Sequence, residues 1–304
     1  MSLKKKTIKW LNKNATSLSD KTILITGANS GIGFKTAEVC LFLGARVIMA
    51  CRNKERAEEA KKALINEYPQ ADISILTLDL ASFSSIDAFA NEIIENKIDI
   101  NIFVNNAGVF HRPGKKTANG LEEVIGVNYF GVYYLAKKLL PYFESLDHEV
   151  DFVTTISMIY KFAKKINYND FFYDKKYKNI AVYARSKLCL AKLSYYLSQK
   201  YKNSNIRIFM THPGISMTPL GINAYGKIVG NMAKAIKWMF NSPEKSSLSL
   251  IYALSHNVSA GTIVGPTKLF GGWGYPKINK TSKKAKTGAE ELIEFTEKII
   301  KERI

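Results

Sequence analysis

The chain has 304 residues, of which 46% are hydrophobic and 23% are charged, and its formal net charge is +18 at pH 7. These proportions are ordinary for a globular protein with a sizeable core, folded as one large domain or two small ones. No apolar run approaches the ~18 residues of a membrane-spanning helix, and no apolar stretch follows the lysines near the N-terminus. The sequence therefore predicts neither a transmembrane helix nor a secretory signal.

The excess of positive charge leaves two interpretations open. It could attract nucleic acid or an anionic membrane surface, or it could be a lysine-rich solvated surface in a chain that is also rich in Asn and Ile. The lysines are spread along the chain and interleave with no recognisable nucleic-acid motif, which favours the second interpretation. We expect no nucleic-acid partner and leave a weak contact with an anionic membrane open.

Cysteine and histidine usage bears on compartment and metal binding. The cysteines Cys40, Cys51 and Cys189 form no CxxC pair, which fits a reducing cytoplasm without disulfides. The four histidines have no spacing typical of metal ligands, so no metal site is predicted.

Residues 1–20 form a basic, polar extension, in which Trp10 and Leu11 either pack on the protein or belong to a frayed tail. An apolar, β-rich run at 21–26 then predicts a buried strand, which leads directly into a glycine-rich loop and a helix at 34–43. In this context the glycines permit close backbone approach and the helix N-terminus attracts a pyrophosphate. We therefore predict dinucleotide binding by the loop residues Gly27, Asn29, Ser30, Gly31, Ile32 and Gly33.

A second buried strand, at 45–50, ends at Cys51 and Arg52. A carboxylate at this place would bind the adenosine ribose of NAD(H) and repel a 2′-phosphate, whereas a guanidinium is suited to binding that phosphate. NADP(H) is therefore favoured over NAD(H). The alternative is that Arg52 is an ordinary exposed residue before the helix that Asn53 caps.

Strand and helix patterns continue to alternate along the chain. Further strands are predicted at 73–78, 98–104, 149–156 and 206–210, with helices at 82–96, 121–143, 228–240 and 243–255 and a short last strand at 269–270. This alternation predicts an α/β fold: a single Rossmann-type, doubly wound parallel sheet of about seven strands, flanked by helices on both faces, over residues 21–276. Residues 277–304 are expected to be a basic linker and an amphipathic helix packed on that domain.

The carboxyl ends of the parallel strands would meet at one edge of the sheet, where ligands bind in such folds. That edge would collect Gly27, Arg52, Asp79, Asn105 and Ser157. The aromatic segment 158–180, which follows Ser157, is either a lid over a lipophilic pocket or a flap packed on the fold or on a partner subunit.

Tyr183 and Lys187 are four residues apart in a predicted helix, so both side chains can point into one cleft. A phenol titrates near ~10 in water, and a neighbouring ammonium lowers that pKa. Tyr183 could then exchange a proton with an alcohol or carbonyl oxygen. Such a pair is common in ordinary helices, but here it accompanies a loop that would hold a hydride donor.

With these motifs in order, residues 20–275 resemble the short-chain dehydrogenase/reductase superfamily. The motifs are Thr26-Gly27 to Gly33, Asp79-Leu80, Asn105-Asn106-Ala107-Gly108, Asn128, Ser157, Tyr183-x-x-x-Lys187 and Pro213-Gly214. Within the superfamily, the runs at 50–52, 79–82 and 272–276 and the C-terminal helix resemble the retinol-dehydrogenase-like branch. The gap between Ser157 and Tyr183 is longer than in most of the superfamily.

The resemblance implies a role for each catalytic residue. Tyr183 would be the general acid/base, and Lys187 would lower its pKa and bind the nicotinamide ribose. Ser157 would bond the substrate oxygen, and Asn128 would help to hold a water that leads protons to Lys187.

The resemblance also implies cofactor contacts. Asp79, followed by Leu80, would bond the adenine amino group. Asn105 would lie against the adenosine ribose, in the same motif as Ala107 and Gly108, and Thr218 would bond the carboxamide after the turn at Pro213 and Gly214.

The branch implies an NADP(H)-dependent enzyme that interconverts a lipophilic ketone or aldehyde and an alcohol. Two other functions stay open at this point: a non-catalytic member that senses NADP(H) and binds a partner, and a basic nucleic-acid or membrane-surface binder on the same fold. The substrate and any homo-oligomer are left open.

Overall fold

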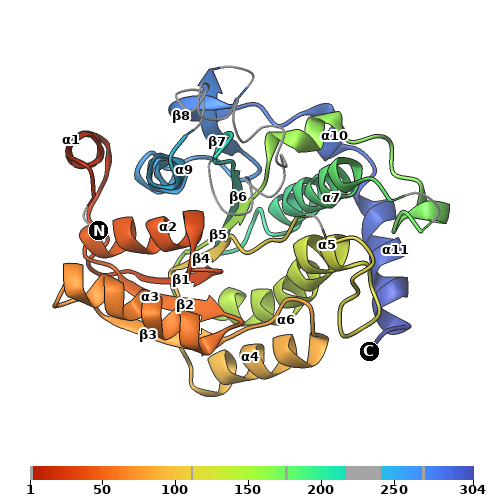
Figure 1. Ribbon diagram of the computed structural model, residues 1–304, viewed down its shortest axis with the longest axis horizontal. Coiled ribbons are helices and arrows are strands. Elements are labelled where there is room, and N and C mark those ends of the chain that lie inside the picture. The colour runs from red at the N-terminus through yellow and green to blue at the C-terminus, as the bar shows by residue number, and fades with distance from the viewer. Residues whose placement is uncertain (1–2, 111, 175–176, 217–240, 269–270) are drawn as a thin grey trace.

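The computed structural model describes residues 3–110, 112–174, 177–216, 241–268 and 271–304. Within these ranges one eight-stranded sheet runs through the middle of the molecule in the order β3-β2-β1-β4-β5-β6-β7-β8 (Figure 1). The predicted doubly wound α/β fold is confirmed. The first seven strands are parallel to their neighbours, and β8 is added antiparallel to β7, which the sequence analysis did not anticipate.

The strands are β1 (Thr22–Thr26), β2 (Arg46–Cys51), β3 (Ile73–Thr77), β4 (Ile102–Asn105), β5 (Val150–Thr155), β6 (Ile206–Thr211), β7 (Ile263–Lys268) and β8 (Trp273–Asn279). Strand β4 is buried at every residue, as expected for a parallel strand covered on both faces. Residues 269–270, where a last strand was expected, and the helix predicted at 228–240 lie outside the described ranges.

Helices cover both faces of the sheet (Figure 1). One apolar layer includes residues of α1 (Lys5–Asn14), α2 (Gly31–Phe42), α3 (Lys54–Glu67) and α9 (Pro243–Ser255). The other includes residues of α4 (Phe83–Glu95), α6 (Val132–Glu144), α7 (Asn179–Lys200), the short α10 (Lys283–Lys286) and α11 (Ala289–Lys301). No helix in the part of the chain that the structure describes is long and apolar enough to cross a membrane.

The basic N-terminal extension contains helix α1, which packs on the body. Leu11 is only 1% exposed, and the Trp10 ring is stacked on Tyr275 of β8 with the ring centres 6.0 Å apart. The lysines at 5, 6, 9 and 13 are exposed. An apolar anchor on the inner side of this short helix therefore places the positive charge outward.

The helix expected at 121–143 is divided into α5 (Glu123–Ile125), a π-helical turn η1 (Gly126–Gly131) and α6. Two close approaches require glycine here: a Cβ at Gly131 would lie 2.2 Å from the Leu80 carbonyl oxygen, and one at Gly126 would lie 2.4 Å from a Thr117 methyl carbon. π-Helical turns often mark functional sites because they widen the helix locally. Asn128 lies in this turn.

The C-terminal helix α11 lies beside these elements at one end of the molecule (Figure 1). The Tyr129 hydroxyl of η1 and the Thr296 hydroxyl are 2.6 Å apart, and the Tyr133 hydroxyl donates to the Glu297 carboxylate. Phe295 packs against Phe171 of the aromatic segment, with ring centres 4.8 Å apart. Helix α11 therefore contacts η1, α6 and the aromatic segment, all of which precede it by more than a hundred residues.

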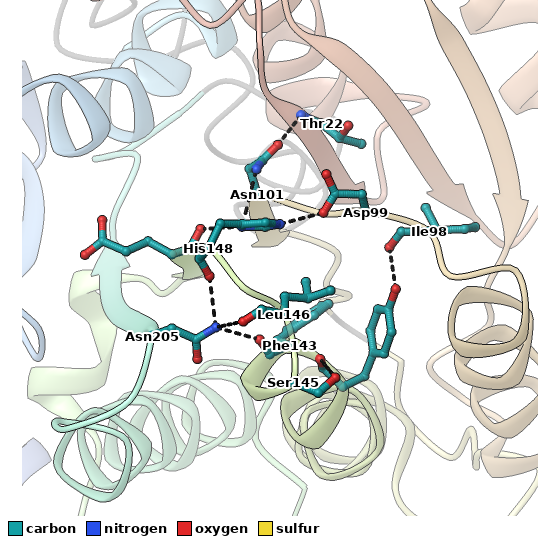
Figure 2. A network of polar contacts seen from close by, with 11 residues as sticks. Thr22, Ile98, Asp99, Asn101, Phe143, Ser145, Leu146, His148 and Asn205 are labelled. Atoms are coloured by element: carbon teal, nitrogen blue, oxygen red, sulfur yellow. Dashed lines mark hydrogen bonds and ion pairs between the residues drawn. The ribbon is translucent and has the colours of Figure 1, made fainter.

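At the amino ends of the central strands, polar side chains close the bottom of the sheet (Figure 2). The Asn205 amide donates to three backbone carbonyls, at Phe143, Leu146 and His148. The His148 ring bonds Asp99, and Asn101 accepts from the Thr22 amide. These contacts fill the edge at the amino ends of the strands. The candidate active site lies at the opposite edge, where the parallel strands end.

Candidate active site

The glycine loop between β1 and α2 forms one wall of a cavity of about 710 Å³. Gly27 and Gly31 have φ of 68° and 58°, and a Cβ at Gly33 would lie 2.3 Å from the Gly27 carbonyl oxygen. These three positions therefore favour glycine, and the backbone there can approach a ligand closely. The predicted loop residues Gly27, Asn29, Ser30, Gly31 and Ile32 line the cavity, with the start of α2 behind them.

The end of β4 supports this loop. The Thr26 hydroxyl accepts from the backbone amides of Asn106 (3.0 Å) and Ala107 (2.9 Å), and the Asn106 side chain donates to the Thr26 carbonyl (3.0 Å). Asn106, Ala107 and Gly108 line the cavity. These bonds join the end of β1 to the end of β4, and so they fix the position of the glycine loop relative to β4.

Asn105 lies apart from the cavity lining. It is the last residue of β4 and is 2% exposed, and Asn106 lines the cavity instead. Asn105 pairs with Thr154 of β5, and the contact expected between Asn105 and an adenosine ribose stays a prediction. Its amide atoms have no hydrogen-bond partner among the residues that the structure describes.

At the far end of the cavity, two basic residues and one acidic residue mark a place for a nucleotide. Arg52, Arg56, Asp79 and Leu80 line it. The Arg52 side chain is 58% exposed, with a guanidinium nitrogen 3.9 Å from Asp79 Oδ1, and that oxygen also accepts from the Ala81 amide at 2.9 Å. Arg52 is thus held at the edge of the cavity with most of its donors available, as phosphate binding requires. Sequence analysis missed Arg56, although its position one helical turn after Arg52 was a usable signal.

At the other end, Ser157, Tyr183 and Lys187 all line the same cavity. Ser157 follows β5 and caps a 3₁₀ helix, η2 (Met158–Phe162), by accepting from the Ile159 amide at 3.4 Å. The Tyr183 ring meets Phe110 edge-on at 5.0 Å between centres. The three residues predicted to carry the chemistry are therefore brought together from two elements.

Lys187 is buried beside Tyr183. Its side chain is 4% exposed, its Nζ is 5.9 Å from the centre of the Tyr183 ring, and it donates to the Thr155 carbonyl at 3.1 Å. Burial lowers the pKa of this ammonium to about 8, because a charge is costly away from water. The lysine is still mostly protonated at neutral pH, so it places a positive charge next to the phenol.

Asn128 is fully buried and does not line the cavity. Its Oδ1 accepts from the Val109 amide at 2.7 Å, and its Nδ2 donates to the Val109 carbonyl at 2.9 Å and to Ser186 Oγ at 3.1 Å. The side chain therefore ties the loop after β4 to helix α7, one residue from Lys187. Its part in a water-mediated proton path stays a prediction.

The remaining wall of the cavity is largely apolar. It is formed by residues that sequence analysis did not assign: Val109, Phe110, Met158, Ile159, Phe162, Ile180 and Ile215. Pro213 and Gly214 line the cavity as predicted, and a Cβ at Gly214, where φ is 75°, would lie 2.5 Å from the Gly272 carbonyl oxygen. Thr218 lies outside the described ranges.

The aromatic segment 158–180 packs on the fold in one part and lines the cavity in another. Phe171 is 2% exposed and packs against Phe130 and Phe295, so this part belongs to the core. Phe162, by contrast, is 80% exposed and lines the cavity. The segment therefore packs on the fold at its middle and borders the cavity near its start.

Comparison with known proteins gives a consistent result. The sequence model of the short chain dehydrogenase family matches residues 21–227. Retinol dehydrogenase 14 of Mus musculus is 36% identical over 244 residues, which cover 76% of this chain and 72% of that protein. Retinol dehydrogenase 13 of Homo sapiens is 34% identical over 206 residues, which cover 67% of this chain and 62% of that protein.

Solved structures show the same fold. An uncharacterised protein from Mycobacterium paratuberculosis superposes with a TM-score of 0.76 at 28% identity, covering 95% of this chain and 96% of that one. A short chain dehydrogenase from Shigella flexneri, crystallised with NADP, gives a TM-score of 0.63 at 21% identity, covering 81% and 96%.

Proposed function

Because the chain belongs to the short-chain dehydrogenase family, in its retinol-dehydrogenase-like branch, we propose that it is an NADP(H)-dependent oxidoreductase that interconverts a lipophilic ketone or aldehyde and the corresponding alcohol. One observation carries the proposal: the glycine loop, Arg52 and the Ser157–Tyr183–Lys187 group line a single cavity. A dinucleotide lying along it would reach from the guanidinium to the phenol.

The residues present fit such a cofactor. The glycine-rich turn at Gly27–Gly33 suits a pyrophosphate, Arg52 suits a 2′-phosphate, and Asp79 would bond the adenine. We assign Lys187 to the nicotinamide ribose, since its ammonium is buried and can donate more bonds than the one to Thr155. Thr218 stays our candidate for the carboxamide. When bound, the cofactor supplies or accepts the hydride.

Residues of the protein, rather than the cofactor, would donate and accept the proton. In reduction, the Tyr183 hydroxyl would donate a proton to the carbonyl oxygen of the substrate, and in oxidation the phenolate would take it back. Ser157 Oγ accepts a long bond, of 3.4 Å, from the Ile159 amide, so its own hydrogen can be donated to that same substrate oxygen. The Lys187 ammonium would stabilise the phenolate electrostatically, because this buried positive charge lies close to the Tyr183 ring.

The apolar wall indicates the kind of substrate. Phe110, Met158 and Ile159 line the same cavity as Tyr183, together with the exposed side chains of Phe162 and Ile180. A compound with an apolar body would bury hydrophobic surface there and leave its oxygen near Tyr183.

The proposal is tested by following NADPH oxidation across ketones, aldehydes and quinones of graded length, with NADH run in parallel. We expect turnover with NADPH that improves with apolar length. Tight NADPH binding without turnover of any carbonyl or alcohol would instead favour the non-catalytic, NADP(H)-sensing function.

A further inference from the structure

Two basic side chains outside the cavity lining hold the aromatic segment that separates Ser157 from Tyr183. The first is Arg185, which lies on α7, two residues after Tyr183, and is 5% exposed. Its Nη1 donates to the Asp170 carbonyl at 2.6 Å and to the Phe171 carbonyl at 2.9 Å. Helix α7 is therefore bonded through Arg185 to the backbone of the aromatic segment that precedes it.

The same guanidinium controls where that loop returns to the helix. It lies 3.9 Å from the centre of the Tyr173 ring, a cation–π contact. Tyr173 has a left-handed backbone, with φ of 58°, which is uncommon for a bulky residue and needs support from its surroundings. Its hydroxyl donates to the Ala181 carbonyl at 3.4 Å, next to Ile180, which is 60% exposed and lines the cavity.

The second basic side chain is Lys284 on the short helix α10. Its Nζ donates to the Lys161 carbonyl at 2.7 Å and to the Ala163 carbonyl at 2.9 Å. These two carbonyls flank Phe162, the most exposed of the apolar residues that line the cavity. One ammonium from the C-terminal part of the chain thus holds the backbone on both sides of this ring.

We propose that Arg185 and Lys284 are positioning residues that fix the two apolar sides of the cavity mouth, Ile180 and Phe162, and so determine how tightly a long apolar substrate is held. This inference rests on the proposed function for its effect on turnover. Neither residue lines the cavity, so neither is a catalytic residue or a cofactor contact.

The middle of the segment is also held by aromatic ring–ring packing in which neither cation takes part. Phe171 is buried against Phe130 and Phe295, with ring centres 6.0 and 4.8 Å away, and Tyr160 is fully buried. Loss of one cation should therefore loosen the mouth without unfolding the segment, because the aromatic packing remains.

The test compares Arg185→Lys and Lys284→Met with the wild type. Lys284 is exposed, so its variant removes two hydrogen bonds at little risk to folding and carries the test if the buried Arg185 variant does not fold. Arg207→Lys is the matched control: the Arg207 guanidinium is also largely shielded from solvent and donates to Asp151, and neither residue lines the cavity. The readouts are NADPH affinity, and kcat and KM for decanal and for propanal.

We expect KM for decanal to rise about tenfold in each variant, the size expected for losing a hydrogen bond from a charged group. KM for propanal, kcat and the NADPH dissociation constant should change less than about twofold, and the control should match the wild type. Unchanged KM for decanal in the variants would overturn the proposal, as would an equal weakening of NADPH binding, which would indicate general loosening of α7.

Hydrogen exchange of residues 158–174 in cofactor-free protein separates this inference from the proposed function. Faster exchange in both variants, together with the KM effect, supports the positioning role. If the wild type reduces no carbonyl, the proposed function fails on its own account. Unchanged exchange in both variants would then still overturn the assignment of Arg185 and Lys284.

Discussion

The Lys187 ammonium lies 5.9 Å from the centre of the Tyr183 ring and donates to the carbonyl of Thr155, the last residue of β5. The lysine is thus anchored to the sheet while the tyrosine is carried by the helix. Their separation is set by how α7 packs on β5 rather than by either side chain alone. Four measurements test what this arrangement and its surroundings do.

Replacing Tyr183 by Phe should remove the proton donor while leaving the ring that meets Phe110 edge-on. We expect kcat to fall at least about a hundredfold, the usual range for losing a general acid, with the NADPH dissociation constant within about twofold of wild type. The control is Tyr195→Phe, on the same helix but absent from the cavity lining. Turnover of Tyr183→Phe close to that of the control would refute the assignment.

Lys187 should make stability depend on pH in cofactor-free protein. Its pKa is about 8 in the folded state, below its ordinary value of 10.5, because burial disfavours the charge. Below pH 8 the folded state buries a charged ammonium, which lowers the free energy of unfolding. Between about pH 8 and pH 10.5 the unfolded state binds more protons at this residue than the folded state does. The free energy of unfolding therefore rises with pH over that range.

We therefore expect Lys187→Met to melt higher than wild type at pH 6.5 and the difference to shrink by pH 9.5. About 1 kcal/mol corresponds to roughly 2–4 °C in a chain of this size. The same variant should lose turnover. Thermal melts at the two pH values are the check, and a difference that grows with pH would contradict the sign.

Arg52 should set the preference between the two nicotinamide cofactors. Arg52→Ala removes the guanidinium beside Asp79, and we expect KM for NADPH to rise at least about tenfold while KM for NADH changes little. Arg46→Ala is the matched control, since Arg46 lies at the start of the same strand and pairs with Asp72 away from the cavity. An equal rise in KM for NADPH and for NADH would show that Arg52 does not distinguish the two cofactors.

His148, at the bottom of the sheet, should stabilise the protein at acidic pH (Figure 2). Burial opposes its charged form, but its bonds to the Glu149 carbonyl (3.0 Å) and to Asp99 (2.5 Å) outweigh this and raise its pKa. A raised pKa gives stability that is complete below the ordinary value near ~6.5 and is lost as pH rises through the folded-state value.

The melting temperature of His148→Gln should accordingly fall further below that of wild type at pH 5.5 than at pH 8.5. His256→Gln, at the C-terminal end of α9, serves as the control. A deficit that is the same at both pH values would mean that His148 acts only through packing.

Local patterns were enough to predict the strand–loop–helix unit at 22–42 and helix α9, since each depends on neighbours in the sequence. The π-helical turn was not predictable, because Gly131 is required by the carbonyl of Leu80, which is distant in the chain. That Asn106 rather than Asn105 lines the cavity was not predictable for a related reason: the exact end of β4 decides which side chain faces the cavity, and a shift of one residue exchanges the two sides.

The apolar lining could not be predicted from sequence patterns because its residues come from several separate stretches of the chain. Phe110, Ile180 and Ile215 become neighbours of one cavity only through the fold. The residues of the glycine loop, Ser157, Tyr183 and Lys187 were found because each occurs in a short motif whose position on its element is regular.

The bond between Tyr129 and Thr296 has a consequence for truncation. A chain cut just before Ala289 would keep the eight described strands and the glycine loop, but it would lose the hydroxyl that holds Tyr129, the neighbour of Asn128 in the π-helical turn. Such a shortened protein should therefore fold its sheet and lose order around Asn128.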